Sequence, residues 1–391
     1  MSDAHITIIG GGVIGCAIAY ELSERYDGIY LIEKNERIPS DKSQSARNSG
    51  VVHAGIYYDS EEPLKARFCV EGNRLLYDFC EEHHVSCKRT GKLIVATNRH
   101  EEEYLDPLLE TSLHNSVPDV RMISGREAIA MEPNINTTSA LYVPTTGIID
   151  SVQYTRKLSQ LAETQGVMFV YGHEVVGIEP KTDGFAISTR RRDYEESFDT
   201  KIIINAAGLY SDVVALMINQ HSPYRIRPLR GEGAKFYHTK RPEITMSGMN
   251  VYPVPCGIWP DGTRVYAEYK EFQRLLEEGE IKRTVGVHLT PTFDPRTIII
   301  IPFTTKPENK EDFRQTVPRE RYLERIINFF PNITAEDIEL DQVGIQAYLD
   351  GYRDFVIERD QIYPNCINLI GINSPGLTSS LAIARHVSGL L

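Results

Sequence analysis

Short β-branched runs and longer apolar stretches alternate at the start of the chain. His5–Ile9 is rich in β-branched residues, and the letters G-G-G-V-I-G follow it at positions 10–15. Cys16–Leu22 is apolar and suits a helix, and Ile29–Glu33 is a second strand-like run. A strand, a glycine turn, a helix and a strand within about 30 residues are the order of a dinucleotide-binding unit, which we therefore predict here.

The next part of the chain shows the same two periodicities. A helical spacing of apolar residues predicts helices at Pro63–His84 and His100–His114, and a short apolar run predicts a strand at Lys92–Thr97. Gly147–Ser151 has the composition of a hinge, and Asp150 or Ser151 is placed to cap a helix that runs through Glu163. β-branched and aromatic runs then predict strands at Met168–Val176, Phe185–Thr189 and Lys201–Asn205.

The second half of the chain is rich in strand-like runs. Across residues 228–307 these runs alternate with proline and glycine, the pattern of an antiparallel sheet. A charged stretch at Tyr269–Arg283 interrupts them and is predicted to be a helical insertion on the surface. Pro318–Phe330 suits a helix, and the chain closes with a strand at Ile367–Gly371, a turn and a helix within Asn373–Leu390.

These elements indicate two interleaved domains. A length of 391 residues suits two domains, because single hydrophobic cores stop growing at roughly 250–300 residues. We predict an α/β (α+β) fold in which a Rossmann-like dinucleotide-binding domain is interleaved with a domain built on a mixed or antiparallel β-sheet. The first is discontinuous and comprises residues 1–90, 150–222 and 340–391. The second, assigned to substrate binding, comprises residues 91–149 and 223–339.

Charge and composition exclude several classes of protein. The net charge of −12 argues against nucleic acid as a partner, because phosphate binding needs a basic surface. No apolar run approaches the ~20 residues of a membrane span, and we expect no signal peptide before the first strand. We therefore expect a cytoplasmic protein, with peripheral membrane contact left open. The six cysteines include no C-x-x-C pair, so we expect free thiols and no metal site.

The glycine turn fits G-x-G-x-x-G at Gly10, Gly12 and Gly15. These glycines allow a tight turn, close approach of a pyrophosphate and close packing of helix on strand, while the helix start offers free N–H groups. Glu33 ends the second strand, where a carboxylate can accept the ribose hydroxyls of a dinucleotide. We add the neighbouring Val13, Ile14 and Lys34 to this cofactor site.

Two further segments bear on whether the dinucleotide is FAD or NAD. The loop Ser45–Gly50 offers Arg47, Asn48 and Ser49 to a pyrophosphate and reaches toward where a flavin ring would lie. The turn Gly371–Thr378 joins an apolar strand to an apolar helix, whose N-terminus would stabilise negative charge on a flavin. A simple capped helix, with Ser374 near the cap, explains that turn equally well.

Residues Ser45–Tyr58, which read S-A-R-N-S-G-V-V-H-A-G-I-Y-Y, closely resemble the signature of L-2-hydroxyglutarate dehydrogenases and oxidases. This family belongs to the D-amino-acid-oxidase-like (DAO) superfamily of FAD-dependent oxidoreductases. Similar stretches span nearly the whole chain, at 64–66, 69–74, 91–97, 132–134, 230–232, 252–255, 286–290, 354–355 and 373–378. The N-terminal block is the specific one.

The resemblance implies an enzyme with FAD as its cofactor and a substrate held against the flavin under a β-sheet lid. It implies oxidation of a small 2-hydroxy acid, L-2-hydroxyglutarate to 2-oxoglutarate, by hydride transfer to flavin N5. Beyond the N-terminal residues already named, it places FAD contacts at Val175, Ala207, Gly208, Gly371, Pro375, Gly376, Leu377 and Thr378. Two departures affect the substrate domain: Cys256–Arg283 looks inserted, and Ile301-Pro302 stands where a Gly-Pro often occurs.

Oxidation of a hydroxyl needs a base near neutral pKa, which points to histidine. Of the eleven histidines, His53 and His288 sit within motifs, and the sequence does not rank them. The carboxylates of an anionic substrate need cations, and arginine can pair with them bidentately. The candidates for binding the substrate are Tyr57, Lys65, Arg230, Tyr252 and Arg353.

Other functions stay open at this stage. One alternative is another flavoenzyme of the superfamily, either a glycerol-3-phosphate dehydrogenase or an amino-acid or amine oxidase. Gln346 stands where related amine oxidases often have arginine, which disfavours the latter. A non-catalytic flavin-binding subunit that relays electrons is an alternative of another class, and an NAD-dependent dehydrogenase is a third. Oxygen, a quinone and a protein carrier all stay open as electron acceptors.

Overall fold

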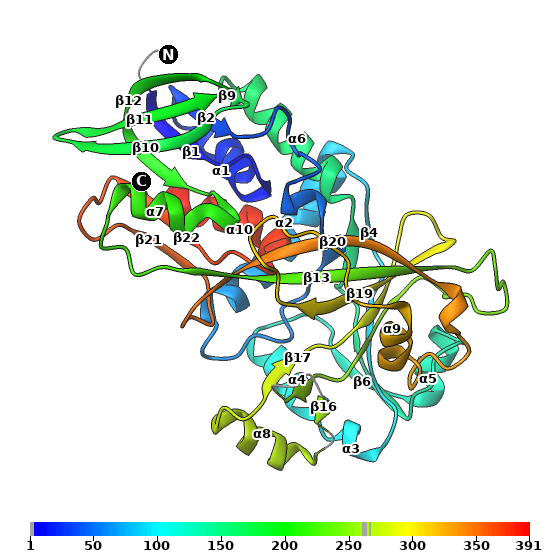
Figure 1. Cartoon of the computed structure of the whole chain (residues 1–391). Coiled ribbons are helices and arrows are strands. Elements are labelled where there is room, and N and C mark those ends of the chain that lie inside the picture. The colour runs from blue at the N-terminus through cyan, green and yellow to red at the C-terminus, as the bar shows by residue number, and fades with distance from the viewer. Residues whose placement is uncertain (1–3, 260–263, 266) are drawn as a thin grey trace.

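The computed structural model describes residues 4–259, 264–265 and 267–391 (Figure 1). Its first sheet has eight strands. In order they are β10 (Glu174–Lys181), β11 (Gly184–Arg191), β12 (Tyr194–Asn205), β1 (Ala4–Ile9), β2 (Ile29–Glu33) and β9 (Met168–Tyr171), with β22 (Cys366–Ile370) beside β12 and β21 (Val356–Arg359) beside β22. The strands β9, β2, β1, β12 and β22 pair in parallel, so their carboxyl ends share one edge.

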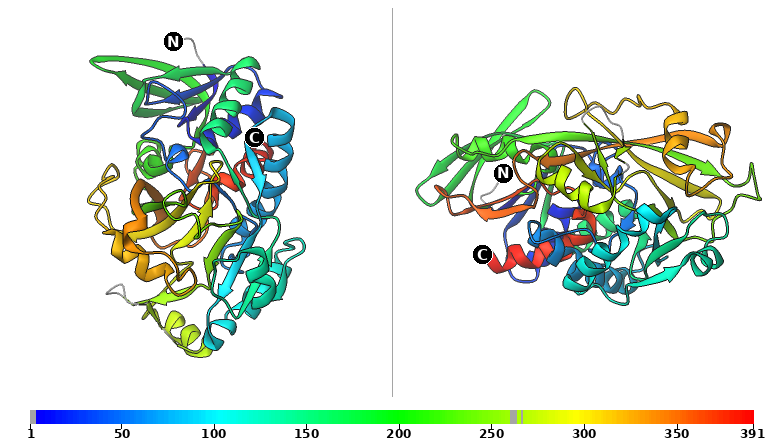
Figure 2. Two further views of the ribbon diagram at one scale, coloured as in Figure 1. Left: turned by 90° about the vertical axis from the view of Figure 1, so that its right-hand side faces the viewer. Right: turned by 90° about the horizontal axis from the view of Figure 1, so that it is seen from below.

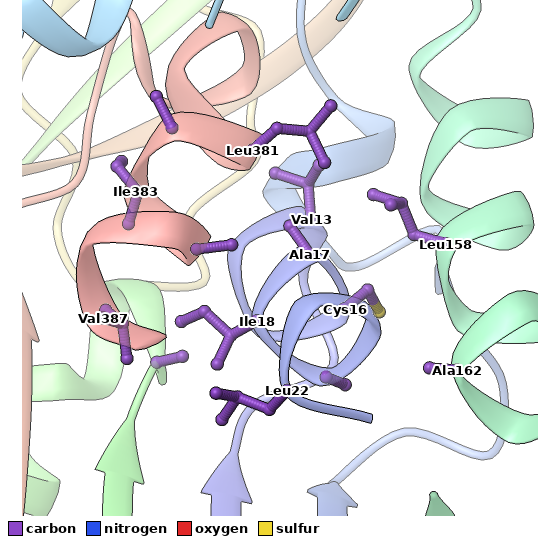
Figure 3. Packing of buried hydrophobic residues seen from close by; sticks show 14 of the residues in the cluster. Val13, Cys16, Ala17, Ile18, Leu22, Leu158, Ala162, Leu381, Ile383 and Val387 are labelled. Atoms are coloured by element: carbon purple, nitrogen blue, oxygen red, sulfur yellow. The ribbon is translucent and has the colours of Figure 1, made fainter. Parts of the chain in front are cut away.

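Helices cover both faces of this sheet. On one face lie α1 (Val13–Ser23), α2 (Pro63–His83), α6 (Ser151–Thr164) and α10 (Gly376–Leu390). Figure 3 shows α1 between α10 and α6, with Ala17, Ile18 and Leu22 among their apolar side chains. The other face packs on α7 (Ser211–Ile218). Along β2, residues 29 and 31 join the first cluster and residues 30 and 32 the second, as expected for a strand buried on both sides.

The second sheet also has eight strands and is antiparallel except for one pair. In order they are β20 (Ile338–Leu349), β13 (Ile226–Tyr237), β19 (Thr297–Thr305), β18 (His288–Pro291), β14 (Asn250–Pro253), β5 (Lys92–Ala96), β7 (Ser139–Val143) and β6 (Arg121–Ser124). Helices α5 (Gly125–Met131) and α9 (Arg319–Ile326) contribute to its core. Figure 2 shows the two sheets toward opposite ends of an elongated molecule.

Smaller elements complete the structure. One small sheet joins β3 (Val51–Val52), β8 (Gly147–Ile149) and β4 (Cys87–Arg89), and another joins β16 (Arg264–Val265), β15 (Cys256–Ile258) and β17 (Lys282–Thr284). The helices outside the main layers are α3 (Arg99–Glu102), α4 (Leu105–His114) and α8 (Tyr269–Glu277), with short 3₁₀ turns at Gln44–Ala46, Gly208–Tyr210 and Ala335–Asp337. No helix in the described ranges is long and apolar enough to cross a membrane.

The α/β fold class predicted from the sequence is confirmed, and Asp150 caps α6 by accepting a hydrogen bond from the Gln153 N–H at 2.9 Å. Two predicted elements are wrong in detail. The strand over residues 168–176 divides into β9 and β10 because Gly172 adopts a left-handed φ of +72°. The helix over residues 100–114 divides into α3 and α4.

The helix predicted over Tyr269–Arg283 is shorter in the structure, because α8 ends at Glu277 and strand β17 begins at Lys282 and pairs with β15. Residues 260–263 and 266 of the insertion at Cys256–Arg283 lie outside the described residues. The division into domains at the residues given above stays a prediction.

Candidate active site

A cavity of about 2460 Å³ runs from the carboxyl ends of β1 and β2 to the strands β14 and β18 of the second sheet. Its volume exceeds the roughly 300–1,000 Å³ of an ordinary small-molecule pocket, so it has room for a dinucleotide and a small substrate together. Ligands of open α/β sheets bind at the carboxyl ends of the strands, which is where this cavity begins.

The glycine turn has the geometry of a phosphate cradle. Gly10 adopts a φ of +109°, and a Cβ there would lie 2.5 Å from the Ala206 carbonyl oxygen. A Cβ on Gly15 would lie 1.9 Å from the Gly10 carbonyl oxygen, so this glycine lets α1 pack against the turn. Gly12 stands at the start of α1 and provides no side-chain cap. The start of α1 lines the cavity, so the positive end of its helix dipole faces any anionic group there.

Glu33 lies beside this turn at the end of β2. Its carboxylate accepts hydrogen bonds from the Gly11 N–H at 2.8 Å and the Asn35 N–H at 2.9 Å. These bonds hold the carboxylate at the cavity wall. The position fits a ribose of the dinucleotide, because a carboxylate oxygen has lone pairs for hydroxyl donors as well.

The loop after β2 closes over the start of α1. The Ser45 hydroxyl accepts a hydrogen bond from the Val13 N–H at 2.8 Å, a contact that the sequence did not indicate. Asn48 braces the loop through its amide, which donates to the Ser45 carbonyl at 2.8 Å and to the Ser151 hydroxyl at 3.1 Å. Arg47 donates to the Val343 carbonyl at 3.1 Å and lies over the Phe313 ring.

Most residues predicted to bind the cofactor line this cavity. They are Gly10, Gly12, Val13, Ile14, Glu33, Lys34, Arg47, Asn48, Ser49, Val175, Ala207, Gly208, Pro375, Gly376 and Leu377. Gly15, Gly371 and Thr378 are not among the lining residues. Gly15 acts in packing, as described above, and a Cβ on Gly371 would lie 2.9 Å from the Leu349 Cβ.

Thr378, near the C-terminus, contacts His53 in the N-terminal part of the chain. It is fully buried in α10, and its hydroxyl accepts a hydrogen bond from the His53 N–H at 3.0 Å. The His53 imidazole Nε2 lies 3.4 Å from the Ser374 hydroxyl of the same C-terminal turn. Ser374 in the turn and Thr378 in α10 therefore hold His53 at the cavity wall.

His288 lies at the far end of the same cavity, on β18. Its imidazole stacks on the Tyr252 ring, with centroids 3.6 Å apart and planes 14° from parallel. Its Nδ1 lies 3.2 Å from the Gly286 carbonyl oxygen. A carbonyl is only an acceptor, so this contact favours the tautomer with a proton on Nδ1 and a free lone pair on Nε2.

Both imidazoles are held in the neutral form. Burial and the charge of Lys92 lower the pKa of His53 to about 3. The same two causes lower the pKa of His288 well below its ordinary value. The hydroxyls of Tyr57 and Tyr252 are buried, that of Tyr57 has no hydrogen-bond partner within the described chain, and both residues line the cavity. The site thus combines two neutral imidazoles, of His53 and His288, with the buried hydroxyls of Tyr57 and Tyr252.

Lys65 and Arg353 also line the cavity but already face carboxylates. The Lys65 ammonium lies 3.0 Å from Glu62, and it also donates to the Arg353 carbonyl. The Arg353 guanidinium pairs with Asp59 at 2.9 Å and with Glu61. These cations and acids form one cluster at the rim.

Arg230 lies apart from these residues, so the structure lends no support to its predicted contact with the substrate, which stays a prediction. Its side chain is 4% exposed and pairs with Glu232 at 3.1 Å and Asp312 at 2.8 Å. The Thr305 hydroxyl shares the Nε–H of Arg230 with Glu232, and the Thr316 hydroxyl accepts a hydrogen bond from Nη2. Its neighbour Gly231 lines the cavity whereas Arg230 does not, because successive residues of a strand face opposite sides of a sheet.

Comparison with known proteins accords with this site. The family model for DAO, FAD dependent oxidoreductase, matches residues 5–390. An L-2-hydroxyglutarate dehydrogenase of Indibacter alkaliphilus is 32% identical, with 98% of each chain covered. A glycerol 3-phosphate dehydrogenase of Caloramator mitchellensis is 31% identical, with 99% of this chain and 73% of that protein covered.

A solved structure gives the same result. The dithionite-reduced L-α-glycerophosphate oxidase of Mycoplasma pneumoniae, with FAD bound, matches with a TM-score of 0.84 at 25% identity and covers 100% of this chain and 95% of its own. The resemblance to L-2-hydroxyglutarate dehydrogenases and the choice of FAD as the cofactor are thereby confirmed. The chain belongs to the DAO family of FAD-dependent oxidoreductases.

Proposed function

We propose that this enzyme oxidises the C2 hydroxyl of L-2-hydroxyglutarate to give 2-oxoglutarate. The observation that carries the proposal is the single cavity that begins at the glycine turn and ends between two neutral histidines, His53 and His288. The near full-length similarity to an L-2-hydroxyglutarate dehydrogenase supports the substrate.

We assign the role of base to His288 and that of orienting group to His53. The Gly286 carbonyl favours a proton on Nδ1 of His288, which leaves Nε2 to accept the proton of the substrate hydroxyl. Burial and Lys92 hold the pKa of His288 well below the near-neutral value expected of the base, so the assignment rests on the free Nε2 and its place in the cavity. Stacking on Tyr252 holds the ring in place. His53 has weaker side-chain support, a single contact of 3.4 Å to Ser374.

The cofactor is proposed to lie along the cradle of Gly10, Gly12 and Glu33, with Arg47–Ser49 and the turn at Pro375–Leu377 completing its contacts. When bound, FAD supplies the acceptor for the hydride that leaves C2 of the substrate. Lys65, Arg353, Tyr57 and Tyr252 are proposed to bind the substrate, with Lys65 and Arg353 shared between its carboxylates and the acids at the rim.

Replacing Gly15 with alanine tests the cradle. The new methyl group would meet the Gly10 carbonyl oxygen and push α1 away from the turn. Overpacking costs roughly 1–3 kcal/mol, so FAD binding should weaken by about ten- to a hundredfold. Flavin fluorescence titration of the apoprotein measures this. Gly389→Ala is the matched control because a Cβ there meets no atom within 4 Å; equal FAD affinity in both variants would contradict the assignment.

The substrate is tested by an anaerobic absorbance spectrum of the purified holoenzyme before and after addition of L-2-hydroxyglutarate. We expect the flavin band to bleach with this substrate and not with its D-enantiomer or with amino acids. Persistence of the oxidised spectrum would refute the substrate assignment and leave the family unchanged.

A second candidate is oxidation of glycerol 3-phosphate, favoured by the 31% identical dehydrogenase and by the matching glycerophosphate oxidase structure. Bleaching by glycerol 3-phosphate in the same experiment would select it. The electron acceptor, a cytoplasmic location and peripheral membrane contact stay predictions.

A further inference from the structure

Lys92, the first residue of β5, is a buried cation next to the proposed reaction site. The residue is 1% exposed. Its Nζ lies 3.8 Å from the centroid of the Tyr252 ring and 5.5 Å from that of the Tyr57 ring. Both rings line the cavity. The Tyr252 ring also stacks on His288, so these two rings lie between the ammonium group and the space where a substrate would lie.

Within residues 4–259, 264–265 and 267–391, no carboxylate lies within ion-pair distance of Lys92. This distinguishes it from Lys65 and Arg353, which both face acids at the rim. Burying a charge is costly unless an opposite charge compensates it. The aromatic faces of Tyr57 and Tyr252 supply part of that compensation, and an anion in the cavity would supply more.

We propose that Lys92 is an electrostatic specificity residue for the oxidation proposed above: from behind Tyr252 it favours a substrate with a second carboxylate over one with a neutral group in its place. The inference rests on that proposed function and deepens it. The intervening space is protein, so the field of the ammonium reaches the cavity with little screening by salt. The charge of Lys92 acts on the substrate at a distance, across the Tyr252 ring, and without direct contact.

The ionisable groups named around Lys92 keep a constant charge between pH 6 and 9, so the titration of Lys92 can be measured in that range. Burial lowers the pKa of Lys92 to about 7. His53 and His288 are already neutral above pH 6, because their pKa values lie well below the ordinary one. Burial raises the pKa values of Tyr57, Tyr252 and Cys69, so these groups keep their protons up to pH 9. Between pH 6 and 9, Lys92 is the member of this set that changes charge.

The test compares wild type and Lys92→Met, both as anaerobic holoenzyme at pH 6, in stopped-flow reduction of the flavin. L-2-Hydroxyglutarate and its 5-amide are the two substrates, so that one carboxylate is replaced by a neutral group of similar size. We expect the substitution to raise the Kd of L-2-hydroxyglutarate roughly tenfold, as two charges some 12 Å apart at an effective dielectric of ~20 imply. The Kd of the 5-amide should change less than threefold.

Lys88→Met is the matched control, because Lys88 lies on β4 with an exposed side chain. A merely structural role for Lys92 would weaken both substrates equally, and an unchanged ratio of the two Kd values overturns the proposal. Failure of L-2-hydroxyglutarate to reduce the wild-type flavin refutes the proposed function itself, and the inference falls with it.

The wild-type protein gives a second readout that needs no variant. Lys92 is charged below pH 7, so the Kd of L-2-hydroxyglutarate should be lowest near pH 6 and rise about tenfold by pH 9 as the ammonium loses its proton. The 5-amide should show no such rise. A Kd of L-2-hydroxyglutarate that is flat between pH 6 and 9 overturns the proposal as well.

Discussion

Replacing His288 with asparagine should slow reduction of the flavin by L-2-hydroxyglutarate by roughly 10²–10⁴-fold, the usual loss when a general base is removed. Asparagine can keep the hydrogen bond to the Gly286 carbonyl through its amide, but it has no counterpart of Nε2. The limiting rate at saturating substrate, from anaerobic stopped-flow absorbance, measures the effect. Flavin content and melting temperature serve as checks that the variant is folded.

The matching variant His53→Asn distinguishes the two histidines. Its backbone N–H still bonds to Thr378, so the loop should stay in place. As the orienting group, His53 should affect the Kd of the substrate more than the limiting rate, with a loss in rate of about tenfold or less. A larger loss in rate for His53→Asn than for His288→Asn would reverse the two assignments.

Replacing Arg230 with methionine should destabilise the protein by about 3–5 kcal/mol, because it leaves the buried carboxylate of Glu232 without a cation, whereas Asp312 keeps its pair with Arg314 at 2.7 Å. Glu232 is fully buried and keeps only its hydrogen bonds from Thr305, Thr316 and Val317. The free energy of unfolding, from urea titration followed by circular dichroism, measures the loss. The Kd of the substrate should stay within about twofold in the folded fraction.

Arg321→Met provides the control for the loss of an arginine. Arg321 pairs with Glu324 at 2.7 Å on the exposed surface of α9, and such pairs contribute about 0–1 kcal/mol. Adding Glu232→Gln to Arg230→Met should recover part of the stability, since it removes one uncompensated charge. An Arg230→Met protein as stable as wild type but with a much higher substrate Kd would support the predicted contact of Arg230 with the substrate.

Local sequence accounts for much of the cofactor end of the cavity. The turn at Gly10, Gly12 and Gly15 and the carboxylate of Glu33 lie within one β–α–β unit. Their relative positions follow from strand and helix geometry over about 30 residues, so spacing alone predicts them. Asp150 as the cap of α6 is predictable for the same reason, because a cap and its helix are adjacent in the chain.

The substrate end depends on pairings between distant segments. Lys92 faces Tyr252 because β5 pairs with β14, about 160 residues away in the chain. The contact between Thr378 and His53 spans 325 residues. Arg230 and Gly231 face opposite sides of one strand, and the register of β13 against β19 and β20 decides which of them meets the cavity.

The sequence by itself determined the fold class, the family and the glycine cradle, since each of these is encoded in short-range periodicity or in continuous motifs. Only the tertiary structure decided which charged residues are available to a substrate. In the structure, Arg230 pairs with buried acids, and Lys65 and Arg353 lie beside carboxylates at the rim. Lys92 has no carboxylate partner in the described chain and lies over the Tyr252 ring. The physical reason is that the residue type alone gives the charge of a side chain. Whether an opposite charge lies beside it depends on the register in which distant strands pair.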